Sequence, residues 1–282
     1  MDYTLLLIVV FLVVIGLVIL YSTSAYNGQV KFHDSFYYLK KQAFATVLGI
    51  VLMLFVAGMD YHIWQRLAVF GYLAAVALSV AVMLFGREIN GSKRWLALGP
   101  FSFQPSEFAK VALILFLADL VTKNVKTIGK MWTLCRIMFW ILPIVGLVGA
   151  SNLSTAIIIL GIAVILAFVS RPGYAQFLWI GLAGTGVVTI FLMMEQYRLE
   201  RLVIWKNPEA HEKGFQTIQG LYAIGSGGLF GTGFGKGIQK LGFLPEAQND
   251  MIFSIICEEL GLIGAVLLLM LFLILLWRFM VI

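Results

Sequence analysis

The sequence predicts an all-α polytopic membrane protein with eight membrane-spanning helices and a long outer loop between the seventh and the eighth. Of its 282 residues, 61% are hydrophobic and 12% are charged, whereas soluble domains average about 45–50% and about 25%. The mean hydropathy is +0.97, and the apolar residues form runs long enough to cross a bilayer as helices. These observations exclude a soluble globular domain, a disordered chain and a collagen.

The apolar runs follow one another with polar gaps between them. The first predicts a retained helix, because no basic segment precedes it and no small-residue cleavage site follows it. The fifth and sixth are short and are separated only by a turn at Ser151–Ser154. Barrel strands are excluded, since they are about ten residues long and alternate in polarity. The expected spans are Leu5–Tyr21, Gln42–Met59, Leu67–Phe85, Pro105–Val121, Ile137–Ala150, Thr155–Ser170, Tyr174–Met194 and Met251–Trp277.

The charged residues lie mostly in the gaps. Short gaps on the two sides carry equal numbers of basic residues, so the positive-inside rule does not decide the orientation, although the dense cluster Lys123–Arg136 favours a cytoplasmic amino terminus. With that orientation, residues 195–250 face outward and carry six acidic and six basic residues. This balance predicts a mixed-charge surface rather than a polybasic lipid anchor. The net charge of +6 suits a membrane surface, and no nucleic-acid partner is expected.

We expect one integral membrane domain over residues 1–282, with residues 195–250 as a large extracytoplasmic loop within it. The chain stops directly after an apolar run, at Trp277–Ile282, without a polar tail. We therefore expect the natural protein to continue beyond this point.

One expected span carries charges near its start. Glu107 and Lys110 are three residues apart, so on a helix that begins at Pro105 they share a face and can pair. A charge within a span is costly unless it is paired or faces a cavity, which marks the pair as a functional-site candidate. The alternative is that Ser106 and Glu107 cap the helix in water while Lys110 extends outward to the interface.

The glycine-rich stretch Gly225–Gly237 fits neither nucleotide-binding template. A Walker A motif needs Gly where Phe230 stands and Ser or Thr where Gly237 stands, and no G-x-G-x-x-G register fits. Glycine here suits backbone that approaches a bulky ligand or re-enters the membrane surface. A flexible outer loop agrees with the composition equally well.

Carboxylates stand at the start of the eighth span and inside it. Asp250 precedes the span directly, where partial desolvation would raise its pKa and favour a general-base role. The alternative is an N-cap role, in which backbone N–H groups would lower its pKa. Glu258 and Glu259 lie within the span, where burial forces at least one of them to pair or to be protonated.

The three histidines and two cysteines lie in separate segments without metal-ligand spacing, so the residues predict no metal site and no disulfide framework. Phosphate chemistry would invite a divalent cation such as Mg or Mn, but no ligand cluster demands one.

At these residues the sequence resembles the SEDS family of shape, elongation, division and sporulation proteins, which includes RodA, FtsW and SpoVE. The likeness extends over essentially the whole chain, and Tyr21–Ala25 with the spacing from Gly235 to Leu244 is closer to the FtsW and SpoVE branch. Family members usually have about ten spans. The segments that carry the resemblance are Ser92–Trp95, Gln104–Lys110, Gly220–Gly237, Leu244–Glu246, Asn249–Phe253 and Glu258–Gly261.

The resemblance implies a peptidoglycan glycosyltransferase that polymerises lipid II into glycan strands at the outer face of the bacterial cytoplasmic membrane. The family's essential aspartate falls on Asp250, which then acts as general base. The implied partners are a class B penicillin-binding protein transpeptidase and other divisome or elongasome membrane proteins. The residues that charge and location add as candidates for substrate binding are Lys93, Arg94, Glu107, Lys110 and Glu246.

Two other functions stay open from the residues. In a lipid II flippase or transporter, Glu107, Lys110, Asp119 and Glu258 or Glu259 would line a translocation path. A non-catalytic scaffold for a transpeptidase would need none of these roles. The halves of the chain show no self-similarity of the kind common in transporters, which favours the enzyme.

Overall fold

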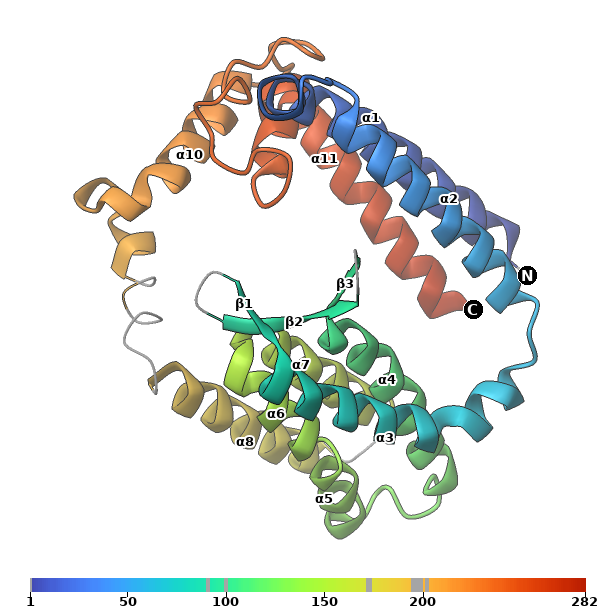
Figure 1. The fold of residues 1–282 in the computed structure, drawn as a ribbon. Helices are drawn as coiled ribbons and strands as arrows, with labels where there is room; N and C mark the ends of the chain where they lie inside the picture. The colour runs from blue at the N-terminus through green and yellow to red at the C-terminus, as the bar shows by residue number, and fades with distance from the viewer. Residues whose placement is uncertain (1, 90–91, 99–100, 171–173, 194–199, 201–202) are drawn as a thin grey trace. The chain divides into compact units, whose positions relative to one another are not determined.

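The computed structural model describes residues 2–89, 92–98, 101–170, 174–193, 200 and 203–282, most of which lie in helices (Figure 1). Two short 3₁₀ helices, Pro208–Ala210 (η1) and Glu212–Gly214 (η2), precede α10. The helices are α1 (Tyr3–Phe32), α2 (Tyr37–Ala57), α3 (Tyr61–Phe85), α4 (Pro105–Lys123), α5 (Met131–Phe139), α6 (Leu142–Ser151), α7 (Leu153–Val169), α8 (Tyr174–Met193), α10 (Phe215–Gly227) and α11 (Ile252–Val281).

A helix lies at each of the eight segments predicted to span the membrane. Among the described residues, α1, α2, α3 and α11 are long and apolar enough to cross a bilayer, and α5 with α6 passes the same test as a pair bent by 42°. The chain is therefore a helical, multi-pass membrane protein, as predicted, and the count of eight spans stays a prediction. The fifth predicted span is a bent pair that begins at Met131, six residues before the predicted start at Ile137.

The packing divides the chain into two compact units. Unit 1 consists of Met1–Met59 and Glu200–Ile282, and unit 2 of Asp60–Leu199. The expectation of one membrane domain over residues 1–282 remains a prediction.

In unit 1, α1 packs against both α2 and α11, and α10 packs against α11. Arg278 near the end of α11 forms an ion pair with Asp2, the N-cap residue of α1, so the two helices run antiparallel. Helix α11 is interrupted at Gly261, which has a φ of 67° and a ψ of −172°. The segment expected as the long loop, residues 195–250, contains α10, η1 and η2 in its described part and is thus partly helical.

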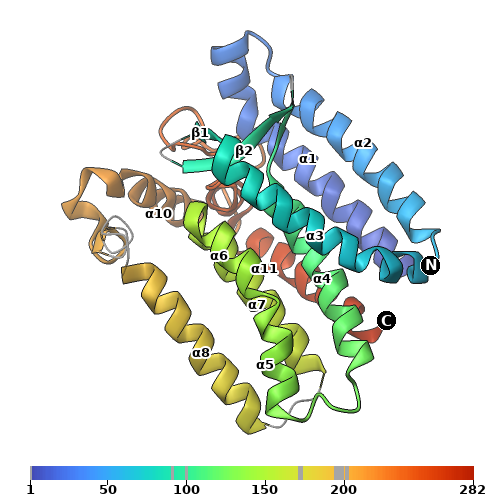
Figure 2. The same ribbon diagram turned by 60° about the horizontal axis from the view of Figure 1, so that its bottom comes forward.

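In unit 2, α3 and α4 run side by side in both views, and α6 with α7 packs next to them (Figures 1 and 2). Tyr72 of α3 stacks on Phe116 of α4 with ring centroids 4.3 Å apart, and Trp140 contacts both rings edge-on.

Asp60 caps the start of α3. The hydrogen bonds it accepts from the backbone N–H and then the ring of His62 hold the pKa of this exposed carboxyl below its ordinary value.

Unit 2 contains a small antiparallel sheet, which the predicted all-α fold class did not include. Its strands β1 (Arg87–Ile89), β2 (Ser92–Leu98) and β3 (Phe101–Phe103) lie in the order β1-β2-β3 between α3 and α4. The sequence holds a signal for it, since Asn90-Gly91 is a strong hairpin dipeptide.

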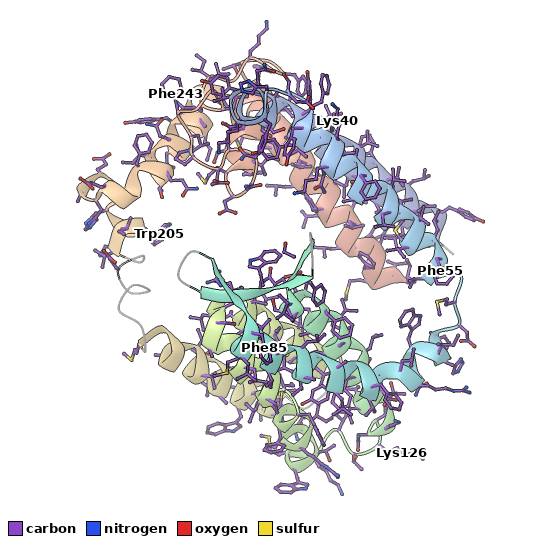
Figure 3. All side chains as sticks on the ribbon, in the orientation of Figure 1. Lys40, Phe55, Phe85, Lys126, Trp205 and Phe243 are labelled. Atoms are coloured by element: carbon purple, nitrogen blue, oxygen red, sulfur yellow. The ribbon has the colours of Figure 1, made fainter. Side chains whose placement is uncertain are left out.

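The long helices carry many exposed large apolar side chains, among them Phe55 and Phe85 (Figure 3). Phe44 and Phe55 of α2, for example, are 74% and 67% exposed. Helix α2 has no buried residue at all. Such surfaces are stable only in an apolar solvent, which agrees with a lipid environment.

Candidate active site

Asp250 lies in the turn that leads into α11, and its side chain is exposed. The N-cap residue of α11 is Met251, and no side chain caps this helix. The N-cap alternative for Asp250 is therefore wrong. Across the described residues, the Asp250 carboxylate has no hydrogen bond and no ion pair, which leaves it available to accept a proton.

The turn around Asp250 is closed by hydrogen bonds to Glu246. The backbone carbonyl of Glu246 accepts from the N–H groups of Asn249 (2.9 Å) and Met251 (3.3 Å). The Asn249 side-chain amide donates to Glu246 Oε2 at 2.6 Å. Glu246 itself has a φ of 52° and is exposed. Its observed role is thus to shape the turn that presents Asp250.

The same turn is attached to the helices of unit 1. Leu244 and Ala247 are buried against Ile255 of α11. The buried Gln248 accepts a hydrogen bond of 2.9 Å from the Asn27 amide of α1. Because both apolar and polar contacts hold it, the segment that carries Asp250 is fixed relative to α1 and α11.

A buried ion pair lies behind this segment. Lys240 and Glu259 are 5% and 4% exposed, and the Lys240 ammonium pairs with the Glu259 carboxylate. Ser22 of α1 joins them: its hydroxyl donates to Glu259 at 2.8 Å and accepts from Lys240 Nζ at 2.7 Å. The Gly235 N–H donates to Glu259 Oε2 at 3.0 Å. The expectation that at least one of the two intramembrane glutamates pairs is confirmed.

The Glu258 carboxylate is held by backbone N–H groups instead of a cation. Its Oε1 accepts from the N–H groups of Ile238 (2.7 Å) and Gln239 (3.2 Å), while Oε2 is buried without a partner among the described residues. Carboxylates Glu258 and Glu259 thus tie the two ends of the Gly235–Lys240 segment to α11.

The glycine-rich stretch wraps around the interruption in α11. The N–H groups of Thr232 and Gly233 donate to the carbonyls of Glu258 and Glu259, at 2.9 and 3.0 Å. In return, Leu262 N–H donates to the Gly228 carbonyl at 2.9 Å. The backbone groups that the interrupted helix leaves unpaired are thereby satisfied.

These contacts need glycine. A Cβ on Gly227 would lie 1.9 Å from the Cys257 carbonyl oxygen, and one on Gly231 would lie 2.2 Å from that of Glu259. The glycines therefore allow close approach to helix α11. The sequence had predicted close approach to a ligand or to the membrane surface, or a flexible loop.

In unit 2, the predicted pair at the start of α4 is formed. Lys110 Nζ lies 2.8 Å from Glu107 Oε2, with the two side chains 24% and 58% exposed. Arg94 of β2 donates from Nε to the Ser151 carbonyl at the end of α6, at 3.1 Å. The structure describes the backbone of Lys93, opposite Glu88 in the sheet, whereas the Lys93 side chain lies outside the described part.

The predicted site residues therefore fall into two groups. Asp250 and Glu246 share one turn of unit 1, and Arg94, Glu107 and Lys110 belong to unit 2. Arg94 and Ser106 also line one small pocket of unit 2, together with Ser79, Pro105, Ser151 and Asn152.

The sequence reasoning missed Lys240 and Ser22. Lys240 lies in a polar segment just after the glycine-rich stretch, where a lysine is expected to be solvated, and its partner Ser22 is 218 residues away. The signal that could have found Lys240 is the unpaired Glu259 in an apolar span, which demands a cation.

Among the described residues, no group of three or more His, Cys, Asp or Glu side chains could hold a metal ion. The basic side chains of unit 2 that the contacts above place are Lys110 and Arg94.

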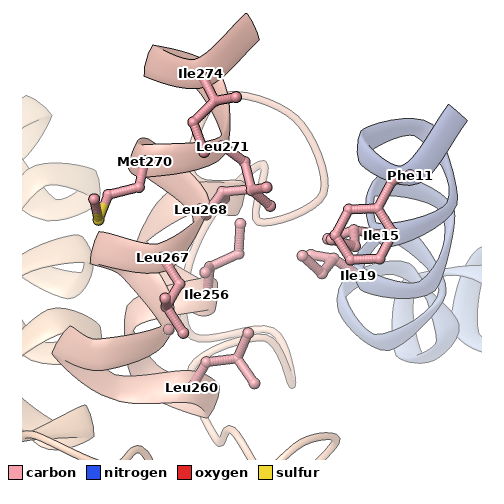
Figure 4. A pocket seen from close by; sticks show the side chains of 11 residues that line it. Phe11, Ile15, Ile19, Ile256, Leu260, Leu267, Leu268, Met270, Leu271 and Ile274 are labelled. Carbon is pink, nitrogen blue, oxygen red and sulfur yellow. The ribbon is translucent and has the colours of Figure 1, made fainter. Parts of the chain in front are cut away.

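An apolar groove of about 550 Å³ lies between α1 and α11. Phe11, Ile15 and Ile19 of α1 face Leu268 and Leu271 of α11 across it (Figure 4). Its lining carries no charged residue, so it offers a surface for hydrocarbon and no group for acid–base chemistry.

The fold and the site define a class: a multi-pass helical membrane protein with a free carboxylate on a fixed turn before a broken helix. The family model of FtsW, RodA and SpoVE, described as "Cell cycle protein", matches residues 3–282. The chain belongs to this family, as the sequence motifs predicted.

Individual relatives agree. Stage V sporulation protein E of Bacillus subtilis (strain 168) is 38% identical over 289 residues, covering 98% of this chain and 77% of that protein. The probable peptidoglycan glycosyltransferase FtsW of Geobacter sp. (strain M18) is 34% identical over 286 residues, with the same coverage of 98% and 77%.

A solved structure is similar as well. One chain of the solved structure titled "Structural coordination of polymerization and crosslinking by a peptidoglycan synthase complex" has a fold similar to that of this chain, with a TM-score of 0.75 and 30% sequence identity. The similarity covers 98% of this chain and 76% of that chain. The agreement in both sequence and fold supports the helix assignments above.

Proposed function

We propose that this protein is a peptidoglycan glycosyltransferase that polymerises lipid II, with Asp250 as the general base. The observation that carries the proposal is the Asp250 carboxylate, which is exposed and unpartnered among the described residues on a turn fixed to α1 and α11. The relatives named as probable glycosyltransferases support the same activity.

In the proposed reaction, Asp250 takes the proton from a hydroxyl of the acceptor sugar. The resulting oxygen nucleophile attacks the anomeric carbon of the donor, and the bond from that carbon to the pyrophosphate oxygen breaks. Undecaprenyl pyrophosphate leaves with the bonding electrons. The proton stays on Asp250 until it passes to solvent.

The leaving diphosphate gains negative charge as the bond breaks, and cations stabilise that charge best when they are held in place beforehand. We assign this role to Lys110, which Glu107 orients, and to Arg94 and Lys93. Glu246 has a supporting role, because its backbone and carboxylate hold the turn that carries Asp250.

We further propose that the protein resides in the bacterial cytoplasmic membrane with the Asp250 turn on the extracytoplasmic side. A class B penicillin-binding protein transpeptidase is the proposed partner, supported by the similarity to a chain from a peptidoglycan synthase complex. Polymerisation and crosslinking act on the same strand, which makes such a pairing chemically sensible.

The transporter alternative is less well supported by the contacts. Asp119 accepts from the Gln65 amide at 3.0 Å and pairs with Lys123 at 2.7 Å. Glu259 is occupied by Lys240. Asp119 and Glu259 are thus held in fixed pairs, which makes these two carboxylates poor elements of a moving ion or lipid path.

The test is polymerisation of purified lipid II by the full-length protein with its partner transpeptidase, comparing wild type with Asp250→Asn. We expect turnover to fall at least a hundredfold, the range of general-base catalysis, while lipid II binding is retained. Glu209→Gln is the matched control, because Glu209 is exposed and unpartnered among the described residues. Undiminished polymer from Asp250→Asn would refute the base assignment, and lipid II binding without any polymer from wild type would favour the transporter.

A further inference from the structure

A second cavity, of about 430 Å³, lies in unit 2 between α3, α4 and α5. Its volume is within the range of about 300–1,000 Å³ that is typical of small-molecule sites. The inner wall is apolar, with Val69 and Leu73 of α3 and Leu120 of α4 beside the aromatic cluster of Tyr72, Phe116 and Trp140.

Besides Tyr72 and Trp140, three residues with polar side chains line this cavity. Asn124 is the C-cap residue of α4, and Thr133 and Arg136 belong to α5. These three side chains therefore stand where the cavity meets the polar gap between α4 and α5. Arg136 is exposed and has no ion pair within the described ranges.

The surrounding gap is strongly basic. From Asn124 to Arg136 the chain contains Lys126, Lys130 and Arg136 and no acidic residue. Lys126, labelled in Figure 3, and Lys130 are exposed without partners in the described structure. Lys123, by contrast, is neutralised by Asp119. Arg136 in the cavity lining thus belongs to a segment with an unbalanced positive charge.

Within unit 2, this cavity is separate from the Glu107–Lys110 pair. Glu107 and Asn124 are 17 residues apart on α4, and at 1.5 Å per helical residue they are separated by about 25 Å along its axis. The cavity therefore opens toward the other end of α4 from the Glu107–Lys110 pair.

We propose that this cavity binds a membrane phospholipid with an anionic headgroup. One acyl chain occupies the apolar wall, and Arg136 binds the headgroup phosphate with Lys126 and Lys130 nearby. Basic pockets between membrane helices are suited to anionic headgroups, and each basic residue contributes about a fivefold gain in affinity. A free phosphate would leave the apolar wall unused, so the observations favour the lipid.

The experiment is a native mass-spectrometry titration of the full chain in a neutral detergent. Phosphatidylglycerol is compared with phosphatidylcholine of the same acyl chains. We expect at least fivefold tighter binding of the first phosphatidylglycerol molecule. Equal affinities for the two lipids would overturn the proposal.

Three variants separate the contributions of charge and cavity. Arg136→Gln should reduce phosphatidylglycerol affinity about fivefold, and Arg136→Lys should restore most of it. Lys41→Gln, at an exposed lysine of α2 that has no partner in the described ranges, removes the same charge elsewhere and should change nothing. Leu73→Trp fills the cavity at a side chain that is 57% exposed and should weaken binding of both lipids.

Equal effects of Arg136→Gln and Lys41→Gln would show non-specific attraction and overturn the proposal. Unchanged lipid binding by the Leu73→Trp variant would also overturn the proposal, since the acyl chain would then lie elsewhere. Glycerol 3-phosphate serves as the headgroup without chains. If it displaced phosphatidylglycerol at equal concentration, the site would be one for a soluble phosphate.

Discussion

The Lys240–Glu259 pair permits a quantitative prediction, because each partner can be removed separately. Lys240→Met keeps the length of the side chain but removes the ammonium group. It leaves the Glu259 carboxylate, 4% exposed, with the Ser22 hydroxyl and the Gly235 N–H as its remaining donors. We expect the free energy of unfolding of unit 1 to fall.

The magnitude follows from the burial. Removing one partner of a buried ion pair costs about 3–5 kcal/mol, because the other charge is left without its counterion. The two remaining donors offset part of that cost, so Lys240→Met should lie near the lower end, at about 3 kcal/mol. Glu259→Gln should cost at least as much, since the buried Lys240 ammonium then has neutral oxygen acceptors but no counterion. The double variant should cost less than the two single changes added together.

The assay is reversible unfolding of the full chain in mixed micelles for wild type, both single variants and the double variant. Lys236→Met is the matched control, because Lys236 is exposed in the same glycine-rich segment. A cost below about 1 kcal/mol for Lys240→Met would place the pair in the range of exposed salt bridges and refute the argument from burial. Strict additivity in the double variant would show that the two side chains do not interact.

Two further predictions concern the glycine-rich segment and α4. Gly227→Ala should destabilise the packing of α10 on α11, because the new Cβ would lie 1.9 Å from the Cys257 carbonyl oxygen, whereas Gly225→Ala meets nothing within 4 Å. Thermal unfolding of the two variants checks this, and equal midpoints would contradict it. Glu107→Gln should change stability by less than about 1 kcal/mol, since its pair with Lys110 is partly exposed, yet lower the polymerisation rate if that lysine needs orienting. A variant with full activity would show that orientation by Glu107 is unnecessary.

The elements that the sequence predicts well are those with a strong local signal. A helix lies at each of the eight apolar runs, although α10 was not predicted, and the three-residue spacing located the Glu107–Lys110 pair. The small sheet was missed because its strands are only three to seven residues long, too short for a periodicity. The bend between α5 and α6 was missed as well. It leaves the Trp140 carbonyl to accept from the Tyr72 hydroxyl at 2.7 Å, a contact that joins residues 68 positions apart.

The candidate site could be predicted only in part, for a related reason. Asp250 was selected by the family resemblance, since its position before an apolar run left a base role and an N-cap role both open, and the role of its surroundings depends on contacts between distant segments. Ser22 belongs to α1, Lys240 to the segment after the glycine-rich stretch and Glu259 to α11, and only folding brings them together. A lysine in a polar segment and a serine in an apolar helix carry no local sequence signal that would predict their contact.

The interruption of α11 connects these observations. A continuous helix at Gly261 would keep its own backbone hydrogen bonds and would offer no attachment for the Gly228–Gly233 backbone. Because α11 is interrupted, the carbonyls of Glu258 and Glu259 accept from Thr232 and Gly233, while the side chains of the same glutamates hold residues 235–240. Two adjacent residues thus attach the glycine-rich segment through both backbone and side chain. The turn that carries Asp250 follows within ten residues of Lys240, so the proposed base, although it lies in a mostly irregular segment, is attached to a fixed support of the kind that catalysis requires.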